Sequence, residues 1–64
     1  MKEKFTLSGV DGNAFSIMGY VRWAMKARNK TKSEIDAYTN DAMSSNYAHL
    51  ICVSNEMIDK LNKE

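Results

Sequence analysis

The fold of this 64-residue chain is decided by residues 13–29, which read NAFSIMGYVRWAMKARN. With about 100° between successive side chains of a helix, the apolar residues of this stretch fall on one stripe, as in a helix that buries one face. Asn13 precedes the stripe and can accept a hydrogen bond from the free amides of the first turn, so it is a suitable N-cap. We therefore predict a helix from about Ala14 to about Asn29. Its core face is expected to consist of Ala14, Ile17, Met18, Val21, Ala24 and Met25.

Two further helices are predicted downstream. The sequence TKSE matches a capping box, in which Thr31 caps the helix and Glu34 reaches back to the cap. This second helix is expected to continue to about Met43, and after a polar break the third is expected to run from about Tyr47 to Leu61. The inward-facing residues are expected to be Ile35, Tyr38, Thr39 and Ala42 in the second helix, and Tyr47, Leu50, Ile51, Ser54, Met57, Ile58 and Leu61 in the third.

The residues before the first helix have a different pattern. From Lys4 to Ser8, polar and apolar side chains alternate, which predicts a short strand or an extended arm. A lone strand leaves its backbone groups unpaired, so the segment must dock on the helices or pair with a second copy. Short connections favour adjacent packing of consecutive helices. The predicted fold is mostly α: a single domain over residues 1–64, with three helices and a short N-terminal extended strand or arm.

Length and composition limit the classes of function. A chain this short buries only about 60% of its surface on folding and is of marginal stability. Because Cys52 is the only cysteine, there is no internal disulfide, and self-association remains as a stabilising device. The net charge of +1 argues against a DNA mimic and gives no bulk support for nucleic-acid binding.

The location of the protein is expected to be cytoplasmic. Residues 1–4, MKEK, do not lead into an apolar run, so we expect no export signal, and no stretch is apolar enough to span a membrane. A single free thiol, at Cys52, is consistent with a reducing compartment.

The stretch FTLSGVDGNAFSIMG, from Phe5 to Gly19, resembles the opening of a family of small uncharacterised bacterial and phage proteins. The similarity continues through the capped second helix and the start of the third, and so covers most of the chain. The sequence departs from the family pattern at residues 28–30, RNK, where a glycine-containing turn is expected. The resemblance implies a phage or mobile-element setting, and it carries over no functional residue.

Two local patterns suggest a ligand but are explained without one. The loop from Gly9 to Asn13 opens a helix, where free amides favour anions, yet it matches neither a P-loop nor a dinucleotide fingerprint, and turn formation and capping account for it. His49, Cys52 and Glu56 are zinc-ligand types on one helix face, but no fourth ligand is evident. We therefore expect no metal, no cofactor and no catalytic residue.

A basic block without an intervening acid extends along the end of the first helix. It consists of Arg22, Lys26, Arg28, Lys30 and Lys32. Together with Trp23 and Tyr20, this combination is typical of proteins that bind single-stranded nucleic acid. The alternative is a solvated face, because helix 2 brings acidic residues close and cations favour the C-terminal end of helix 1.

The most informative feature is a strip of small and aromatic residues about 180° from the core stripe of the first helix. It consists of Ser16, Gly19, Tyr20, Trp23 and Ala27. Gly19 costs about 1 kcal/mol relative to alanine inside a helix, which indicates a close approach there. Either the N-terminal arm covers Trp23 within one chain, or a second copy or a partner packs on it with the aromatic residues as anchors.

The sequence thus predicts a small protein that is not an enzyme. We expect it to be a protein–protein interaction or modulator protein, associated with a phage or mobile element, which binds a protein partner or a second copy as a homodimer. The alternative is a weak nucleic-acid-binding regulator that uses the basic segment from Arg22 to Lys32. No contact with a membrane is expected.

Overall fold

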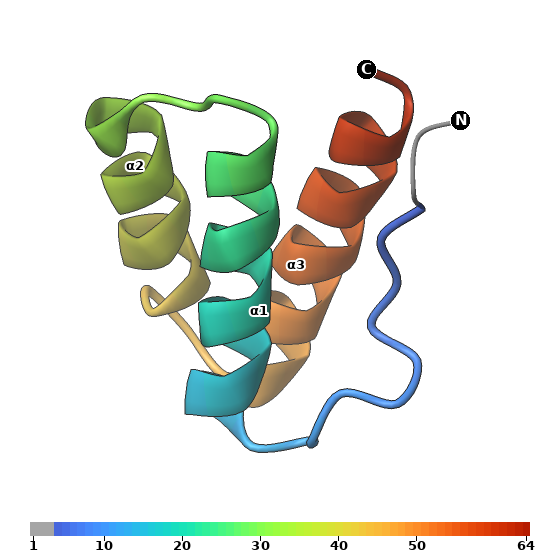
Figure 1. Cartoon of the computed structure of the whole chain (residues 1–64). Helices are drawn as coiled ribbons and strands as arrows, with labels where there is room; N and C mark the ends of the chain where they lie inside the picture. Colours follow the sequence, from blue (N-terminus) through green and yellow to red (C-terminus); the bar gives the residue numbers. More distant parts are fainter. Residues whose placement is uncertain (1–3) are drawn as a thin grey trace.

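Three helices lie side by side, and an extended N-terminal segment runs along them (Figure 1). The computed structural model describes residues 4–64, so Met1–Glu3, on which the expectation of no export signal partly rests, lie outside it. The helices are α1 (Ala14–Ala27), α2 (Lys32–Ala42) and α3 (Tyr47–Asn62), and no strand occurs in the described residues. The predicted all-α fold with a short arm is confirmed. None of the described helices is both long enough and apolar enough to cross a membrane.

Each helix begins at a side chain that caps it. Asn13 Oδ1 accepts a hydrogen bond from the Phe15 amide at 2.8 Å, and Asn46 caps α3 in the same way. In α2 the capping box is complete: Thr31 Oγ1 accepts from the Glu34 amide at 3.2 Å, while Glu34 Oε2 accepts from the Thr31 amide at 3.0 Å. These bonds satisfy amides that have no partner inside the helix, which fixes the starts where the sequence predicts them.

Helix α1 ends at Ala27, two residues before the predicted Asn29. Asn29 adopts a φ of 63°, in the left-handed region. Its amide donates to the Lys26 carbonyl and the Lys30 amide donates to the Met25 carbonyl, both at 3.0 Å. This is the Schellman arrangement, with asparagine where glycine is more common. The predicted end of helix 1 was therefore wrong by two residues because Asn29 terminates the helix.

The core lies between the three helices and is closed on one side by the arm. α1 and α3 share the largest interface. The buried residues are Phe5, Ile17, Met18, Val21, Ala24, Met25, Ile35, Tyr38, Ala42, Leu50, Ser54, Ile58 and Leu61. The predicted inward faces are mostly confirmed. Ala14, Thr39, Ile51 and Met57 are only partly buried.

Tyr47 is the clear error in the predicted core. Its side chain is 50% exposed, and its hydroxyl donates to the Gly12 carbonyl. The residue stands at the first position of α3. Tyr47 therefore ties the start of α3 to the loop before α1 instead of filling the core.

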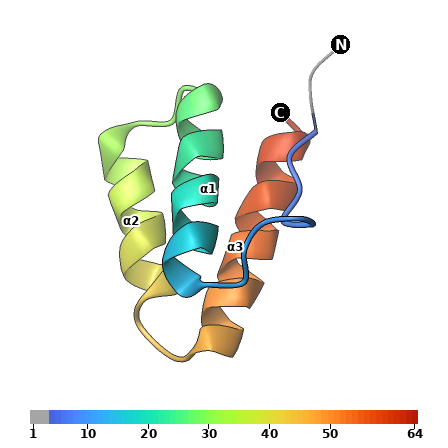
Figure 2. The same ribbon diagram turned by 60° about the horizontal axis from the view of Figure 1, so that its bottom comes forward.

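The arm, residues 4–13, packs on α1 and α3 and does not pair with another described segment as a β-strand. The side-chain amide of Asn62 forms two hydrogen bonds with the backbone of Phe5. Phe5 N donates to Asn62 Oδ1, and Asn62 Nδ2 donates to Phe5 O, each at 2.8 Å. Gly9, with a φ of 85°, then turns the chain, and the Val10 amide donates to the Leu7 carbonyl at 3.1 Å. Figure 2 shows the arm crossing beside α3 on its way to the start of α1.

Candidate functional site

The Trp23 side chain lies where the arm meets α1. The Phe5 ring contacts it edge-on, with centroids 5.6 Å apart and an angle of 88° between the planes. The Tyr20 ring also lies beside it, with the centroids 5.7 Å apart. Phe5 is only 5% exposed, because the Arg28 guanidinium also covers its ring at 4.5 Å. Trp23 nevertheless stays 55% exposed. The arm thus covers part of Trp23 and leaves about half of the side chain exposed.

The rest of the predicted strip divides between arm contact and open surface. Tyr20 and Ser16 are partly buried, and the Tyr20 hydroxyl accepts a hydrogen bond from the Thr6 amide at 3.0 Å. Gly19 and Ala27 are exposed. A Cβ added at Gly19 would meet no atom within 4 Å, so nothing within this chain approaches its backbone closely. The close approach expected at Gly19 is therefore not made by the arm.

A second apolar surface lies at the opposite end of α1, and the sequence analysis did not single it out. Phe15, Met43 and Tyr47 are 77%, 59% and 50% exposed, and they surround one groove of about 270 Å³. We call it the end groove. Its other lining residues are Ala14, Met18, Ala42, Ser45, Asn46 and Leu50.

The end groove contains no charged side chain in its lining. Three of the four large hydrophobic residues that are exposed in the described chain stand around it. One signal in the sequence pointed to it: Phe15 is a large apolar residue outside the core stripe of its helix. The contribution of Met43 could not be read from the sequence, because it depends on how the turn after α2 places that residue beside α1.

Four of the five predicted basic residues come together. Arg22 and Lys26 from α1, Lys30 from the turn and Lys32 from the start of α2 line one pocket of about 340 Å³, together with Ile35 and Asp36. Arg28 does not join them. Its Nε donates to the Leu61 carbonyl at 3.2 Å, and its guanidinium lies over the Phe5 ring.

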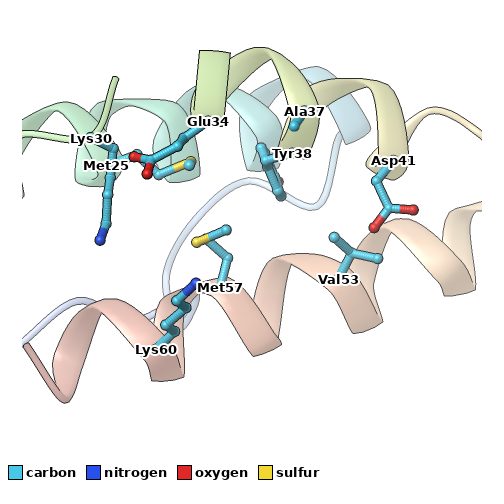
Figure 3. Close-up of a pocket in the computed structure, with 9 residues that line it drawn as sticks. All are labelled: Met25, Lys30, Glu34, Ala37, Tyr38, Asp41, Val53, Met57 and Lys60. Atoms are coloured by element: carbon cyan, nitrogen blue, oxygen red, sulfur yellow. The ribbon is translucent and has the colours of Figure 1, made fainter. Parts of the chain in front are cut away.

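A shallow groove of about 320 Å³ separates α2 from α3 (Figure 3). Met57 and Val53 point into it from α3, facing Tyr38 across the groove. Asp41 lies at one end of the groove, and Lys30, Glu34 and Lys60 lie toward the other (Figure 3).

His49, Cys52 and Glu56 do not converge on one point. Cys52 Sγ lies 4.0 Å from Glu56 Oε1, whereas His49 Nε2 faces Asp41, 3.2 Å from its Oδ1 and 3.0 Å from its carbonyl oxygen. Within residues 4–64, no group of three or more histidine, cysteine, aspartate or glutamate side chains is placed to hold a metal ion.

No protein-family model matches the chain, and neither a curated protein nor a solved structure is similar to it at a significant level. The resemblance of residues 5–19 to small bacterial and phage proteins therefore stays a prediction.

Proposed function

We propose that this protein is a small, non-catalytic protein-interaction module that pairs with a second copy of itself through the end groove. One observation carries the proposal: Phe15, Met43 and Tyr47 stand exposed around a single uncharged groove. Aromatic side chains and methionine are enriched at the centres of protein interfaces, where charged residues are depleted. Exposed aromatic residues beside a pocket are typical anchors of binding energy.

A second copy is the occupant that the chemistry of the groove favours. In a two-fold dimer each patch faces its own copy, so the patch must complement itself. Phe15 projects beside a recess whose floor includes Met18 and Leu50, so the ring of each copy has a recess to enter on the other. Because no charged side chain lines the groove, two copies meet without like charges opposing each other.

The Trp23 face is a weaker candidate for self-pairing. Arg22 and Lys26 line the groove beside Trp23, so a symmetric contact there would bring cations of the two copies together. The proposal therefore places self-association at the end groove and leaves the Trp23 face to a partner of opposite charge.

Sedimentation equilibrium at tens of micromolar tests the proposal. We expect the wild-type chain to dimerise and Phe15→Glu to be monomeric, because the substitution puts a charge on each side of the apolar contact. The Phe15 side chain is 77% exposed, so the monomer fold should be kept, which circular dichroism checks.

Gly19→Leu is the matched control, since it adds bulk on the Trp23 face where a Cβ meets no neighbour. We expect it to leave the dimer intact. A monomeric wild-type chain would contradict the proposal. So would a dimer that Gly19→Leu disrupts and Phe15→Glu does not, because that outcome places the interface on the Trp23 face.

The biological setting is also a proposal. The association with a phage or mobile element depends on the resemblance of residues 5–19, and the cytoplasmic location depends on composition. An accessory protein that acts by binding other proteins is compatible with both.

A further inference from the structure

The four cations that line the pocket between α1 and α2 differ in how far their charges are compensated. Lys30 forms an ion pair with Glu64, so its charge is partly compensated. In the described part of the chain, no ion pair or hydrogen bond joins Arg22, Lys26 or Lys32 to another side chain. Three cations are thus held around one pocket with a single carboxylate, Asp36, in its lining. A cluster of this kind raises the local concentration of anions.

An exposed aromatic ring adjoins these cations. Arg22 and Lys26 also line the neighbouring groove of about 310 Å³, together with Gly19 and Trp23. The two hollows therefore form one continuous surface, which we call the Trp23 basic surface. Because nothing lies within 4 Å of a Cβ built at Gly19, the approach to the indole from that side is open.

We propose that the Trp23 basic surface binds single-stranded nucleic acid. A base stacks on the exposed part of the Trp23 ring, and the phosphates on either side of it contact Arg22, Lys26 and Lys32. An aromatic platform beside a row of cations is the combination that proteins use for single strands without sequence preference. Arginine suits this role because its planar guanidinium matches phosphate geometry.

A single strand can contact both the Trp23 ring, through a base, and the cations, through its phosphates. The bases of a duplex are stacked on one another and would leave the indole without a partner, whereas a single strand offers free base faces. An acidic peptide could pair with the cations but has no base to stack on the ring. The net charge of +1 does not oppose the proposal, because the positive charge that matters is gathered on one surface.

The test is a titration of the protein with a fluorescein-labelled single-stranded oligonucleotide of about 15 thymidines, followed by anisotropy. Trp23 is the only tryptophan, so its intrinsic fluorescence reports stacking directly. We expect saturable binding at low salt with quenching of the indole. Three phosphate contacts predict a slope of log K against log salt of about −2.

Two kinds of variant separate the stacking contact from the charge contacts. Trp23→Ala should lower the affinity roughly tenfold without changing the salt slope. Arg22→Ala and Lys26→Ala should each make the slope shallower by about 0.7. Trp23→Phe keeps an aromatic ring that can stack on a base and should retain most of the binding. Lys60→Ala, which changes a lysine of the α2–α3 groove, is the matched control and should bind as wild type does.

Several outcomes would overturn the proposal. One is the absence of binding at low salt. Another is a preference for duplex over single strand. A third is binding in which an acidic peptide such as polyglutamate displaces the oligonucleotide and no indole quenching occurs, which would indicate an acidic protein partner. Phe15→Glu should bind the oligonucleotide whether or not it dimerises, so failure of the dimer proposal can be told apart from failure of this one.

Discussion

Tyr38 and Ser54 bring two hydroxyl groups into the core, where each is the other's partner at 2.6 Å. Ser54 is fully buried and Tyr38 nearly so. A buried hydroxyl without a partner costs about 1–3 kcal/mol, so the pair sets the position of α2 relative to α3 more strictly than apolar contacts alone. No buried side-chain nitrogen or oxygen in residues 4–64 lacks a partner.

The Tyr38 hydroxyl gives the protein a specific sensitivity to high pH. Burial raises the pKa of Tyr38 above its ordinary value of 10.0, and the hydrogen bond with Ser54 opposes this only in part. The folded state keeps the proton when the unfolded state has lost it, so this contribution to stability is complete below about pH 10 and is lost as the pH rises through the folded-state pKa. We predict that the free energy of unfolding by urea falls as the pH rises above about 10.

Tyr38→Phe should reduce that fall, because the group that titrates is gone. The variant should also be less stable at neutral pH by about 1 kcal/mol, since Ser54 loses its partner. Tyr47→Phe is the control, because Tyr47 is half exposed. In this variant the free energy of unfolding should fall at high pH as it does in wild type. An equal fall with pH in wild type and Tyr38→Phe would show that Tyr38 does not carry it.

Tyr47 and Phe15 show what a residue pattern can and cannot predict. Tyr47 has the helical spacing of a core residue, but it stands at the first position of α3, and its side chain is half exposed. Phe15 is outside the core stripe, and the pattern alone did not reveal that Met43 and Tyr47 lie next to it. Both facts depend on how the ends of the helices are aligned.

At the scale of elements, helix starts were easier to predict than helix ends. A cap is a contact between residues two or three apart, so Asn13 and Thr31 are recognisable in the sequence. The end of α1 depends on the left-handed conformation of Asn29, which many asparagines do not adopt. The arm was predicted only as a strand or an extended segment, because the Asn62 side chain that holds Phe5 is 57 residues away in the sequence.

The arm is expected to detach as a unit when its attachment to α3 is removed. Asn62→Ala deletes both hydrogen bonds to the Phe5 backbone, each of which contributes about 1 kcal/mol. We predict that hydrogen exchange of the Phe5 amide accelerates by at least about tenfold. Trp23 fluorescence should also shift to the red as the Phe5 ring moves away from the indole.

Tyr20→Phe provides the comparison for that experiment. It removes only the acceptor of the Thr6 amide and should speed exchange at Thr6 while leaving Phe5 protected. Unchanged exchange at Phe5 in Asn62→Ala would show that packing of the ring under Arg28, and not the amide of Asn62, holds the arm in place.

At the scale of the whole molecule, the described chain is a thin body of 35 × 27 × 16 Å. A body this thin buries few residues completely and leaves each helix with an exposed face. The exposed features differ in charge: the end groove is uncharged, and the Trp23 basic surface contains three cations that form no ion pair within residues 4–64. This difference allows one surface to hold a second copy while the other binds a polyanion.

The sequence predicted the candidate surfaces unevenly. It identified Trp23 and the basic block, because an aromatic residue opposite the core stripe and a run of cations can be recognised from the order of residues alone. It did not show that Arg28 turns away toward Phe5 and Leu61, since those contacts join residues 23 and 33 positions apart. It also missed the end groove, which forms only when α1, the turn after α2 and the start of α3 come together.

An isotope-filtered NOE measurement on an equal mixture of isotope-labelled and unlabelled chains tests self-association through the end groove most directly. It detects only protons that are close together in different copies. We predict contacts from the Phe15 ring of one copy to the methyl groups of Met43 and Leu50 in the other. Contacts that begin at the Trp23 indole while Phe15 shows none, or the absence of any contact between copies, would contradict the account.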